Sequence, residues 1–341
     1  MNDKPVMSEE KNALLYGAQP GLRFACVLDG KGGCRDLDWS ELTRWTVGWG
    51  TLWVHLERDD PNAQRWLREE SGVDSVTCEA LLAEESRPRV EGNDDTLLAV
   101  LRGVNRANPG EALELVPIHL WIDPNRVISL RDKDHFLMAL RDIREQLVAG
   151  KGPVGPGDLF VQIAEKVVKY VEPMLDEMEE HADELDTTLL ESDTRQCRAQ
   201  LGDLRRRAIS YRRFLAPQRE AMFRLQVEET SWLSKRDKVK LREVTDKLLR
   251  HVEGLDALRD RTTILHEDLT AHVNEQIAKN SLRLAVVAAL LLPPSLVAGL
   301  LGVNIGGIPG ADSPLAFGIL CLIVIVLMPL EYLLLRRLGW F

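Results

Sequence analysis

Small, polar and acidic residues recur at every seventh position along the last third of the chain. A strict seven-residue step keeps one face aligned along a supercoiled helix. Carboxylates on the first part of this face would attract cations over a distance. The pattern therefore predicts a face along which cations move. We call this set the heptad stripe, and its members are Asp246, Glu253, Asp260, Glu267, Asn274, Ser281, Ala288, Ser295 and Gly302.

The later members of the stripe lie in or beside the first of two apolar runs. These runs, Leu284–Leu301 and Leu315–Leu335, are each about as long as a bilayer requires, which is roughly 20 helical residues. A polar turn that opens with Gly302-Val303-Asn304 joins them. The two runs predict a helical hairpin in contact with the lipid bilayer. Because a hairpin alone cannot enclose a pore, any transport requires several copies of the chain.

The side chains of the first run indicate how such a pore would be lined. If several first spans surround an axis with the stripe inward, Ser281 and Ser295 supply hydroxyl groups and Ala288 leaves space. Leu284 and Leu292 would form apolar constrictions, which can gate a pore by excluding water. Two other interpretations stay open. A polar stripe on a stalk is usually a solvated face, and small residues in a span usually mark close helix packing.

Basic residues flank the two runs on one side only. Arg283 precedes the first run, and Arg336 and Arg337 follow the second. The linker 305–314 has no basic residue and one acid, Asp312. Since basic residues favour the cytosolic side, we expect both termini in the cytosol and the linker outside. The N-terminal residues lack an apolar core, so we expect no signal peptide and insertion through the hairpin.

Composition and motifs exclude several functional classes. The chain has 341 residues and a formal net charge of −10, which argues against a nucleic-acid-binding protein. Its 5 cysteines form no CxxC pair, so we expect a reducing compartment and no disulfide framework. No ATP-binding signature occurs, so transport would depend on ion gradients. We therefore expect no enzyme, no catalytic residues and no cofactor.

The fold class expected from the sequence is α+β, with a long helix that continues into the membrane. Leu22–Leu28 and Thr51–Glu57 are β-rich runs, and Arg87–Val104 is typical of a hairpin. The glycine- and proline-rich stretch 150–157 marks a boundary. The expected parts are a cytosolic α/β domain (1–150), a helical hairpin (151–217), a stalk helix (218–281), a first span (282–304), an external turn (305–314), a second span (315–335) and a basic tail (336–341).

The stalk is expected to be a single helix that packs against other helices. Between Gln218 and Leu292 there is no proline and one glycine, Gly254. Apolar residues recur there at steps of three and four, which is typical of a packing seam. The seam consists of Leu241, Val244, Leu248, Val252, Leu255, Leu258, Leu265, Leu269, Val273 and Ile277.

The turn after the first run resembles a known signature. Gly302-Val303-Asn304, at the outer end of the first of two C-terminal spans, resembles the GxN motif of the CorA superfamily of divalent-cation transporters. The resemblance extends over nearly the whole chain. The stretch Gly302–Gly310, GVNIGGIPG, and the region from Arg87 to Leu130 are similar to the bacterial zinc-transporter branch, ZntB. The magnesium branch typically has GMN followed by an acidic or aromatic turn.

The resemblance implies a homopentamer in the inner membrane of a bacterium, in which the first spans line the pore and the second spans face lipid. By this analogy Gly302 and Val303 lie at the mouth, where Asn304 forms a ring that meets a hydrated divalent ion. An amide oxygen can contact a first-shell water without holding the ion too tightly. Asp312 would concentrate cations at the mouth, although a solvated turn residue is the simpler interpretation.

Three functions follow from these patterns. The first is a transporter of hydrated divalent ions that prefers zinc. We expect it to import the ion, and the resemblance to the zinc branch implies coupling to protons. Zinc prefers nitrogen and sulfur ligands, and the predicted pore face has none, so we expect the ion to pass at least partly hydrated. The second is a magnesium, cobalt or nickel channel of the same superfamily. The third is a membrane-anchored coiled-coil sensor or scaffold without a pore.

Overall fold

The protein divides into two units. The structure is a computed structural model, and it describes residues 19–84, 87–93, 95–105, 114–188, 194–303 and 313–337. Unit 1 comprises Met1–Leu189 and Arg195–Leu265, and unit 2 comprises Leu190–Thr194 and His266–Phe341. The residues of unit 2 therefore include both apolar runs.

A seven-stranded mixed sheet forms the centre of unit 1 among the described residues. Its strand order is β2-β1-β3-β7-β6-β5-β4, and every neighbouring pair is antiparallel except β3 and β7. The strands are β1 (Leu22–Leu28), β2 (Cys34–Leu37), β3 (Thr51–Glu57), β4 (Arg89–Asn93), β5 (Thr96–Asn105), β6 (Glu114–Ile122) and β7 (Arg126–Arg131).

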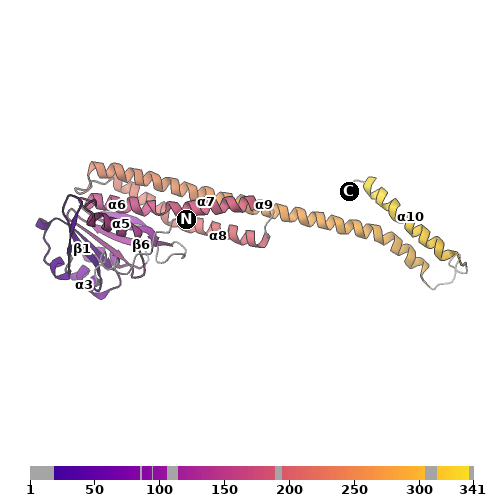
Figure 1. Ribbon diagram of the computed structural model, residues 1–341, viewed down its shortest axis with the longest axis horizontal. Coiled ribbons are helices and arrows are strands. Elements are labelled where there is room, and N and C mark those ends of the chain that lie inside the picture. The colour runs from indigo at the N-terminus through magenta and orange to yellow at the C-terminus, as the bar shows by residue number, and fades with distance from the viewer. Residues whose placement is uncertain are drawn as a thin grey trace. The chain divides into compact units, whose positions relative to one another are not determined.

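Short helices cover both faces of this sheet (Figure 1). On one face, Ala63, Trp66 and Leu67 of α3 pack in the same buried cluster as Val27 and Val54 of the sheet. On the opposite face, α5 and α6 contact each other and β5. The helices of this domain are α2 (Trp39–Leu42), the 3-10 turn η1 (Val47–Trp49), α3 (Pro61–Glu69), α4 (Ser75–Leu82), α5 (Met138–Val148) and α6 (Pro156–Lys169).

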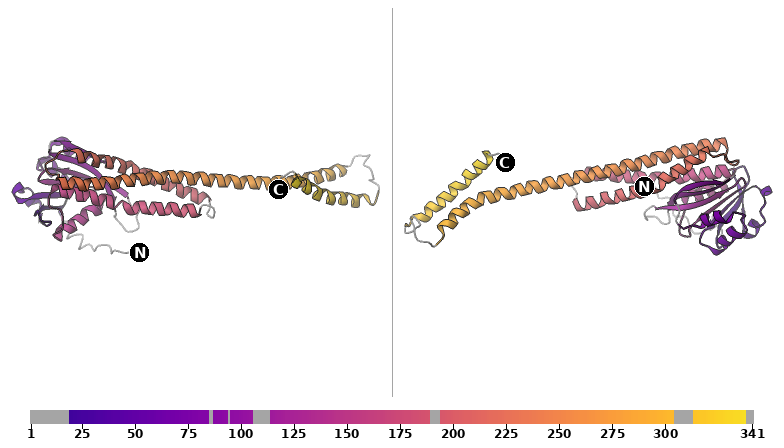
Figure 2. Two further views of the ribbon diagram at one scale, coloured as in Figure 1. Left: turned by 90° about the horizontal axis from the view of Figure 1, so that it is seen from above. Right: turned by 180° about the vertical axis from the view of Figure 1, so that it is seen from behind.

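Three longer helices run side by side beyond the sheet (Figure 2). They are α7 (Glu172–Thr188), α8 (Thr194–Val227) and the first part of α9 (Lys235–Leu301). Arg261 of α9 donates to Asp183 at 2.5 Å and to Asp186 of α7 at 2.8 Å. Arg212 of α8 pairs with Asp256 of α9 at 2.6 Å. These ion pairs are partly exposed, so they fix the register of the helices more than they stabilise the bundle.

The apolar seam predicted along the stalk is confirmed for its unit 1 residues and for Leu269. All of these side chains are buried, with Leu241 and Leu248 fully so. The last two positions of the prediction differ. Val273 is half-buried and Ile277 is 57% exposed, and both lie in unit 2.

The predicted stalk boundary at residue 218 differs from the structure. One helix, α8, continues through Pro217 to Val227, and the stalk helix α9 begins at Lys235. Between them the chain turns, and it buries Trp232 and Leu233 in unit 1. The Trp232 indole donates to the Asp95 carbonyl at 3.0 Å and packs edge-on against Phe160. Burial of these two large side chains outweighs the continuous helical pattern, which contains neither proline nor glycine at this point.

The first part of the helical hairpin expected over 151–217 is divided into two helices. α6 ends at Lys169 and α7 begins at Glu172, so the break precedes Pro173. Pro173 occupies the first turn of α7, where its missing N–H costs nothing. Asp158 lies in the first turn of α6, and its carboxylate accepts from Lys240 of α9 at 2.9 Å. This ion pair therefore joins α6 to the stalk helix.

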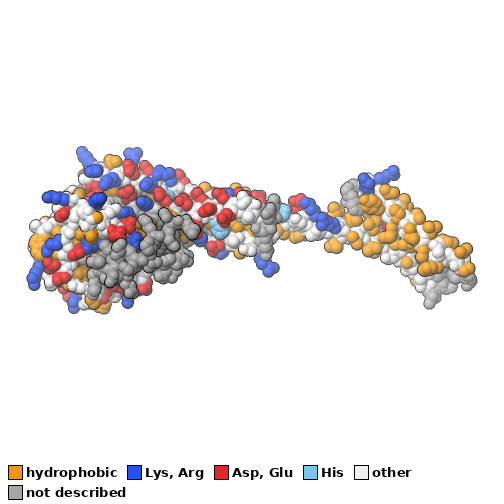
Figure 3. All heavy atoms as spheres, in the orientation of Figure 1, with side chains coloured by type: hydrophobic (Ala, Val, Ile, Leu, Met, Phe, Trp, Pro, Cys, Tyr) orange, Lys and Arg blue, Asp and Glu red, His pale blue; other side chains and the backbone are white. Residues whose placement is uncertain are grey.

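Unit 2 contains the remainder of α9, from His266, and α10 (Ala316–Arg337). Each of the two helices includes a stretch long and apolar enough to cross a membrane. Hydrophobic side chains cover the surface of α10 and of the end of α9, whereas charged side chains dominate unit 1 (Figure 3). Surface of this kind is stable in lipid and not in water.

Candidate cation pathway

The heptad stripe lies along one helix. Asp246 to Ser295 belong to α9, and Gly302 follows its last residue directly. All nine members are exposed in the single chain. In unit 1 the buried seam occupies the other side of α9, so packing against α7 and α8 leaves the stripe uncovered. The face is therefore free to meet solvent or other copies of the chain.

Four carboxylates form the charged part of this face: Asp246, Glu253, Asp260 and Glu267. Asp260 accepts from the neighbouring Arg259 at 2.8 Å, and this contact raises the pKa of the guanidinium. Both groups are exposed, so solvent screens the pair strongly.

The membrane part of the stripe is apolar and small, with two hydroxyl groups. Ser281, Ala288 and Ser295 are exposed, and Leu284 and Leu292 are 72% and 67% exposed. This exposure is what a face shared between several copies requires. Lipid contact requires it equally, so the lining roles of these five residues remain predictions.

The helix ends at a glycine that has little room for a side chain. The Gly302 amide donates to the Ala298 carbonyl at 2.9 Å. A Cβ atom at Gly302 would lie 3.1 Å from that same oxygen, a contact tighter than most. Val303 follows and is exposed. Asn304 and Asp312, which the sequence analysis assigns to the mouth, lie outside the described residues, and Asn274 is exposed on α9 further back.

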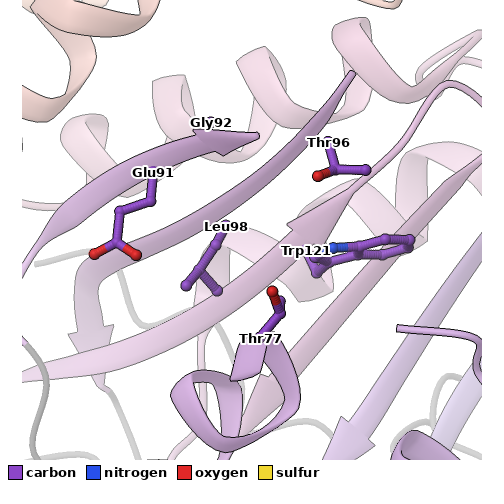
Figure 4. Close-up of a pocket in the computed structure, with 6 residues that line it drawn as sticks. All are labelled: Thr77, Glu91, Gly92, Thr96, Leu98 and Trp121. Carbon is purple, nitrogen blue, oxygen red and sulfur yellow. The ribbon is translucent and has the colours of Figure 1, made fainter. Parts of the chain in front are cut away.

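Unit 1 contains a small cavity that does not resemble a zinc site. It measures about 180 Å³ and opens between β4, β5, β6 and α4 (Figure 4). Glu91 is its single carboxylate, and no thiol or imidazole lines it. The lining residues are Thr77, Glu91, Gly92, Thr96, Leu98 and Trp121.

A group of metal-ligand side chains that the sequence analysis missed lies at the edge of the sheet. Cys26, Cys34 and Asp36 place their sulfur and oxygen atoms within 4.8 Å of one another. A hydrogen bond with Cys26, aided by the charge of Arg144, lowers the pKa of the Cys34 thiol to about 7. The glycine-rich turn Asp29–Gly33 was the available signal, because a hairpin there brings the two cysteines together.

The sequence pattern of the family described as CorA-like Mg²⁺ transporter protein matches residues 49–337. The chain belongs to the CorA family. The match covers the sheet from just before β3, the helical bundle and both apolar helices. The resemblance that was based on the GxN turn is therefore confirmed. Membership of a transporter family also confirms that the chain is not an enzyme.

Relatives in the CorA family cover the chain almost from end to end. The divalent cation transporter CmaX of Pseudomonas aeruginosa is 36% identical over 331 residues, which is 95% of this chain and 98% of the relative. The zinc transport protein ZntB of Pectobacterium carotovorum is 32% identical over 320 residues, 94% of this chain and 96% of the relative.

Solved structures of the CorA family share the architecture. The full-length CmaX structure has a TM-score of 0.80 at 34% identity and covers 95% of this chain and 99% of its own. The CorA magnesium transporter of Methanocaldococcus jannaschii has a TM-score of 0.79 at 18% identity, over 93% of this chain and 98% of its own. These likenesses confirm the predicted fold class: an N-terminal α/β domain, a long helix and two C-terminal apolar helices.

Proposed function

We propose that this CorA-family protein carries divalent cations across a membrane, with zinc preferred. Five copies surround an axis, and the exposed heptad stripe of α9 faces that axis. The stripe acids concentrate cations, and Ser281 and Ser295 provide hydroxyl steps between the apolar positions Leu284 and Leu292. Asn304 contacts the hydrated ion at the mouth.

The observation that supports this proposal most strongly is the continuity of the stripe. One uninterrupted helix, α9, carries acidic residues in unit 1 and small or hydroxylated residues in its apolar part, all exposed. A monomeric anchor has no need for an uncovered stripe of this composition. Several copies of a helix with this face inward form a polar path between apolar surfaces.

The proposed ion enters without losing all of its water. Thiolates and imidazoles, which zinc prefers, do not occur on the stripe. Amide and hydroxyl groups make weak contacts with bound water, and weak contacts allow rapid passage. Selectivity between divalent ions is consequently modest.

Two observations bear on the choice of ion. The GVN turn and the Gly-Gly-Ile-Pro-Gly segment after it resemble the zinc branch, and ZntB relatives align over 94% of the chain. Against this, the family description names magnesium, and CmaX is named for divalent cations in general. Zinc preference is therefore the part of the proposal that a competition experiment must decide, with magnesium, cobalt or nickel as the alternative cargo.

We propose that the protein lies in a bacterial inner membrane with both of its termini in the cytosol. Arg283 precedes the apolar part of α9, and Arg336 and Arg337 form the last turn of α10, which the preference for cytosolic basic residues supports. With this orientation the four acidic residues of the heptad stripe lie on the cytosolic side, where their negative charge attracts cations that enter from outside. The proposed direction is import, with a proton gradient as the driving force.

Flux measurements test the transport proposal. The purified chain is reconstituted in liposomes, and zinc entry is followed with magnesium as competitor and with or without an imposed pH gradient. We expect zinc entry that exceeds magnesium entry and that increases with the proton gradient. Faster magnesium entry would assign the chain a different cargo, and the absence of any flux would favour a scaffold.

The molecular mass of the protein purified in detergent tests the number of copies. We expect a mass that corresponds to five chains, and a dimer would contradict the proposed pore.

Asn304→Ala tests the role of the mouth. We expect the variant to assemble normally and to lose at least tenfold in zinc flux, because the amide oxygen that meets the hydrated ion is gone. Asn280→Ala provides a matched control, since Asn280 is an exposed asparagine on α9 outside the stripe. Equal flux in the wild type and in Asn304→Ala would refute the role of this residue.

A further inference from the structure

Two cysteines and an aspartate share one face of the β1–β2 hairpin at the edge of the sheet. Cys26 of β1 lies directly opposite Asp36 of β2, and Cys34 pairs two positions further along, with Leu28. Since alternate residues of a strand point to the same face, Cys34 and Asp36 lie on the face that carries Cys26. Their ligand atoms are within 4.8 Å of one another, and among the described residues no other such group of three is found.

The hairpin is held in place at its turn. The Asp29 carboxylate accepts from the Lys31 and Gly33 amides at 2.7 and 2.8 Å. The Gly152 amide, in the segment after α5, donates to the Gly32 carbonyl at 2.8 Å. The three ligand side chains are therefore supported by the sheet on one side and by the α5 segment on the other. A pre-positioned set of this kind loses little conformational entropy when a ligand binds.

A buried arginine contacts two of the three ligand side chains. Arg144 of α5 is 2% exposed, and its guanidinium lies 5.2 Å from the centre of the Phe24 ring. It donates to the Cys34 sulfur at 2.9 Å and also to the Asp36 carboxylate. A guanidinium this deeply buried is costly unless negative charge lies beside it. The Asp36 side chain is 63% exposed, so it compensates that charge only in part.

We propose that Cys26, Cys34 and Asp36 bind a thiophilic divalent cation of the zinc type. Two sulfurs and one carboxylate oxygen provide three ligands, and water completes a tetrahedral site. Binding displaces whatever protons the two thiols still hold, so one cation enters and up to two protons leave, depending on pH. Two thiolates and a carboxylate carry three negative charges against two on the cation. The positive charge of Arg144 balances the remaining one.

Arg144 and the cation do not compete for the same lone pairs. Arg144 occupies one direction at the Cys34 sulfur and one oxygen, Oδ1, of Asp36. A thiolate has further lone pairs, and the second carboxylate oxygen stays available. Hydrogen bonds from an outer group to metal ligands orient them and raise affinity. Cys34 is half-buried and Asp36 is exposed, so the cation reaches the site from solvent.

The site is independent of the proposed transport pathway. It lies on the edge hairpin of unit 1, and none of its residues belongs to α9. A bound cation would join β1 to β2 and, through Arg144, both strands to α5. Occupancy is thus expected to stabilise the N-terminal domain, because a ligand that binds only the folded state raises its stability.

Cobalt titration of the full-length protein in detergent, under reducing conditions, tests the proposal. Cobalt bound by thiolates has a charge-transfer band in the near ultraviolet that carboxylate or water ligands do not produce. We expect this band to saturate at one cobalt per chain, to disappear when zinc is added, and to accompany release of up to two protons, with fewer released at higher pH. A wild-type protein without the band would overturn the proposal.

Single substitutions assign the ligands. Cys34→Ser is expected to abolish the band, and Asp36→Asn to weaken cobalt affinity at least tenfold. Cys78→Ser and Cys197→Ser are matched controls elsewhere in unit 1 and should retain it. A band that persists in Cys34→Ser would contradict the site. Asp36→Asn alters an exposed side chain, so it gives a readout even if Cys34→Ser is unstable, and unchanged affinity there would remove Asp36 from the site.

Asn304→Ala separates this site from transport. The variant should keep the thiolate–cobalt band while it loses zinc flux. If wild-type flux is absent but the band is present, the transport proposal fails and the cysteine site stands. If flux is normal and the band is absent, the reverse holds.

Discussion

Burial keeps two histidines of the sheet neutral. The His119 ring nitrogen Nδ1 donates to the Leu81 carbonyl at 2.6 Å, and burial lowers the pKa of the ring to about 4. His55 is fully buried beside Ser129, and its pKa also falls well below the usual value. Neither ring is available as a protonated group near pH 7. Their position in the core, away from the stripe, argues for a structural role.

His119→Gln should weaken the dependence of stability on pH. Above pH 6.5 the ring is neutral in the folded and unfolded chains, whereas between pH 6.5 and about pH 4 only the unfolded chain binds the proton. The free energy of unfolding therefore falls as pH drops through this window, by roughly 3 kcal/mol for this residue. Denaturant unfolding at pH 7 and pH 4.5, followed by tryptophan fluorescence, measures the difference.

The control for this prediction is His266→Gln, which changes an exposed histidine on α9 and leaves both buried rings in place. We expect the pH dependence of the control to match the wild type. If the pH dependence of His119→Gln also matches that of the wild type, the lowered pKa of His119 does not determine stability in acid. The variant keeps a donor for the Leu81 carbonyl, so its stability at pH 7 should fall by only about 1 kcal/mol.

The candidate functional residues near the C-terminus could be predicted from the sequence, whereas the cysteine pair near the N-terminus could not. The stripe and the GVN turn were predictable because a period of seven and a motif at a known place are local properties of the chain. The proximity of Cys26 and Cys34 was not predicted, because the two residues meet only when β2 pairs with β1. That strand is four residues long, with two charged residues, and carries little β signal of its own.

At the scale of elements, the sequence predicted β1, β3 and the buried seam of α9, and it missed the features that tertiary packing decides. β1 and β3 have the predicted bounds, because both are β-rich runs between turn residues. α5 was missed although Leu140, Ile143 and Leu147 have helical spacing, since its N-cap residue Leu137 gives no capping signal. The break before α9 had a local signal in Ser234 and Asp237, which the absence of proline and glycine obscured.

Ser234→Ala should destabilise the start of the stalk helix. The Ser234 hydroxyl accepts from the Asp237 amide at 3.2 Å, and the Asp237 carboxylate accepts from the Ser234 amide at 3.1 Å. This reciprocal capping satisfies two N–H groups that the helix leaves unpaired. We expect the free energy of unfolding to fall by about 1 kcal/mol. Denaturant midpoints of the purified variants provide the measurement.

Lys235→Ala is the matched control, because it lies one residue further along and is exposed. A surface change of this kind should alter stability by no more than about 0.5 kcal/mol. If the two variants are equally stable, the capping pair does not fix the start of α9. The break would then depend on the burial of Trp232 and Leu233 alone.

At the scale of the whole molecule, α9 has a buried face and an exposed face. Its seam packs against α7 and α8 in unit 1, while its stripe stays exposed over its full length. The seam and the stripe both follow the helical repeat on opposite faces of α9, and both are visible in the sequence. What the sequence of one chain does not contain is the number of copies that share the exposed face. The proposed number of five is based on the resemblance to the CorA family, and a two-helix hairpin in any case needs partners to enclose a pore.

Removal of the charge of the stripe should reduce cation flux in a salt-dependent manner. In the triple variant Glu253→Gln, Asp260→Asn, Glu267→Gln, each copy loses three negative charges from the face that we place around the axis. In a pentamer the loss is fifteen charges along one path, so the local cation concentration falls sharply. We expect zinc flux in liposomes to fall several-fold at low ionic strength. Because the Debye length shortens to about 8 Å at 0.15 M salt, the difference should shrink as salt is added.

The triple variant Glu179→Gln, Glu180→Gln, Glu184→Gln removes the same charge from exposed positions of α7 and serves as its control. Its flux should stay close to that of the wild type, because these residues lie outside the stripe. An equal loss in both variants would mean that net charge matters and that the face does not. A loss confined to the stripe variant, and relieved by salt, would follow only if the acids of several copies act on the same cations, which is what an axial path along α9 requires.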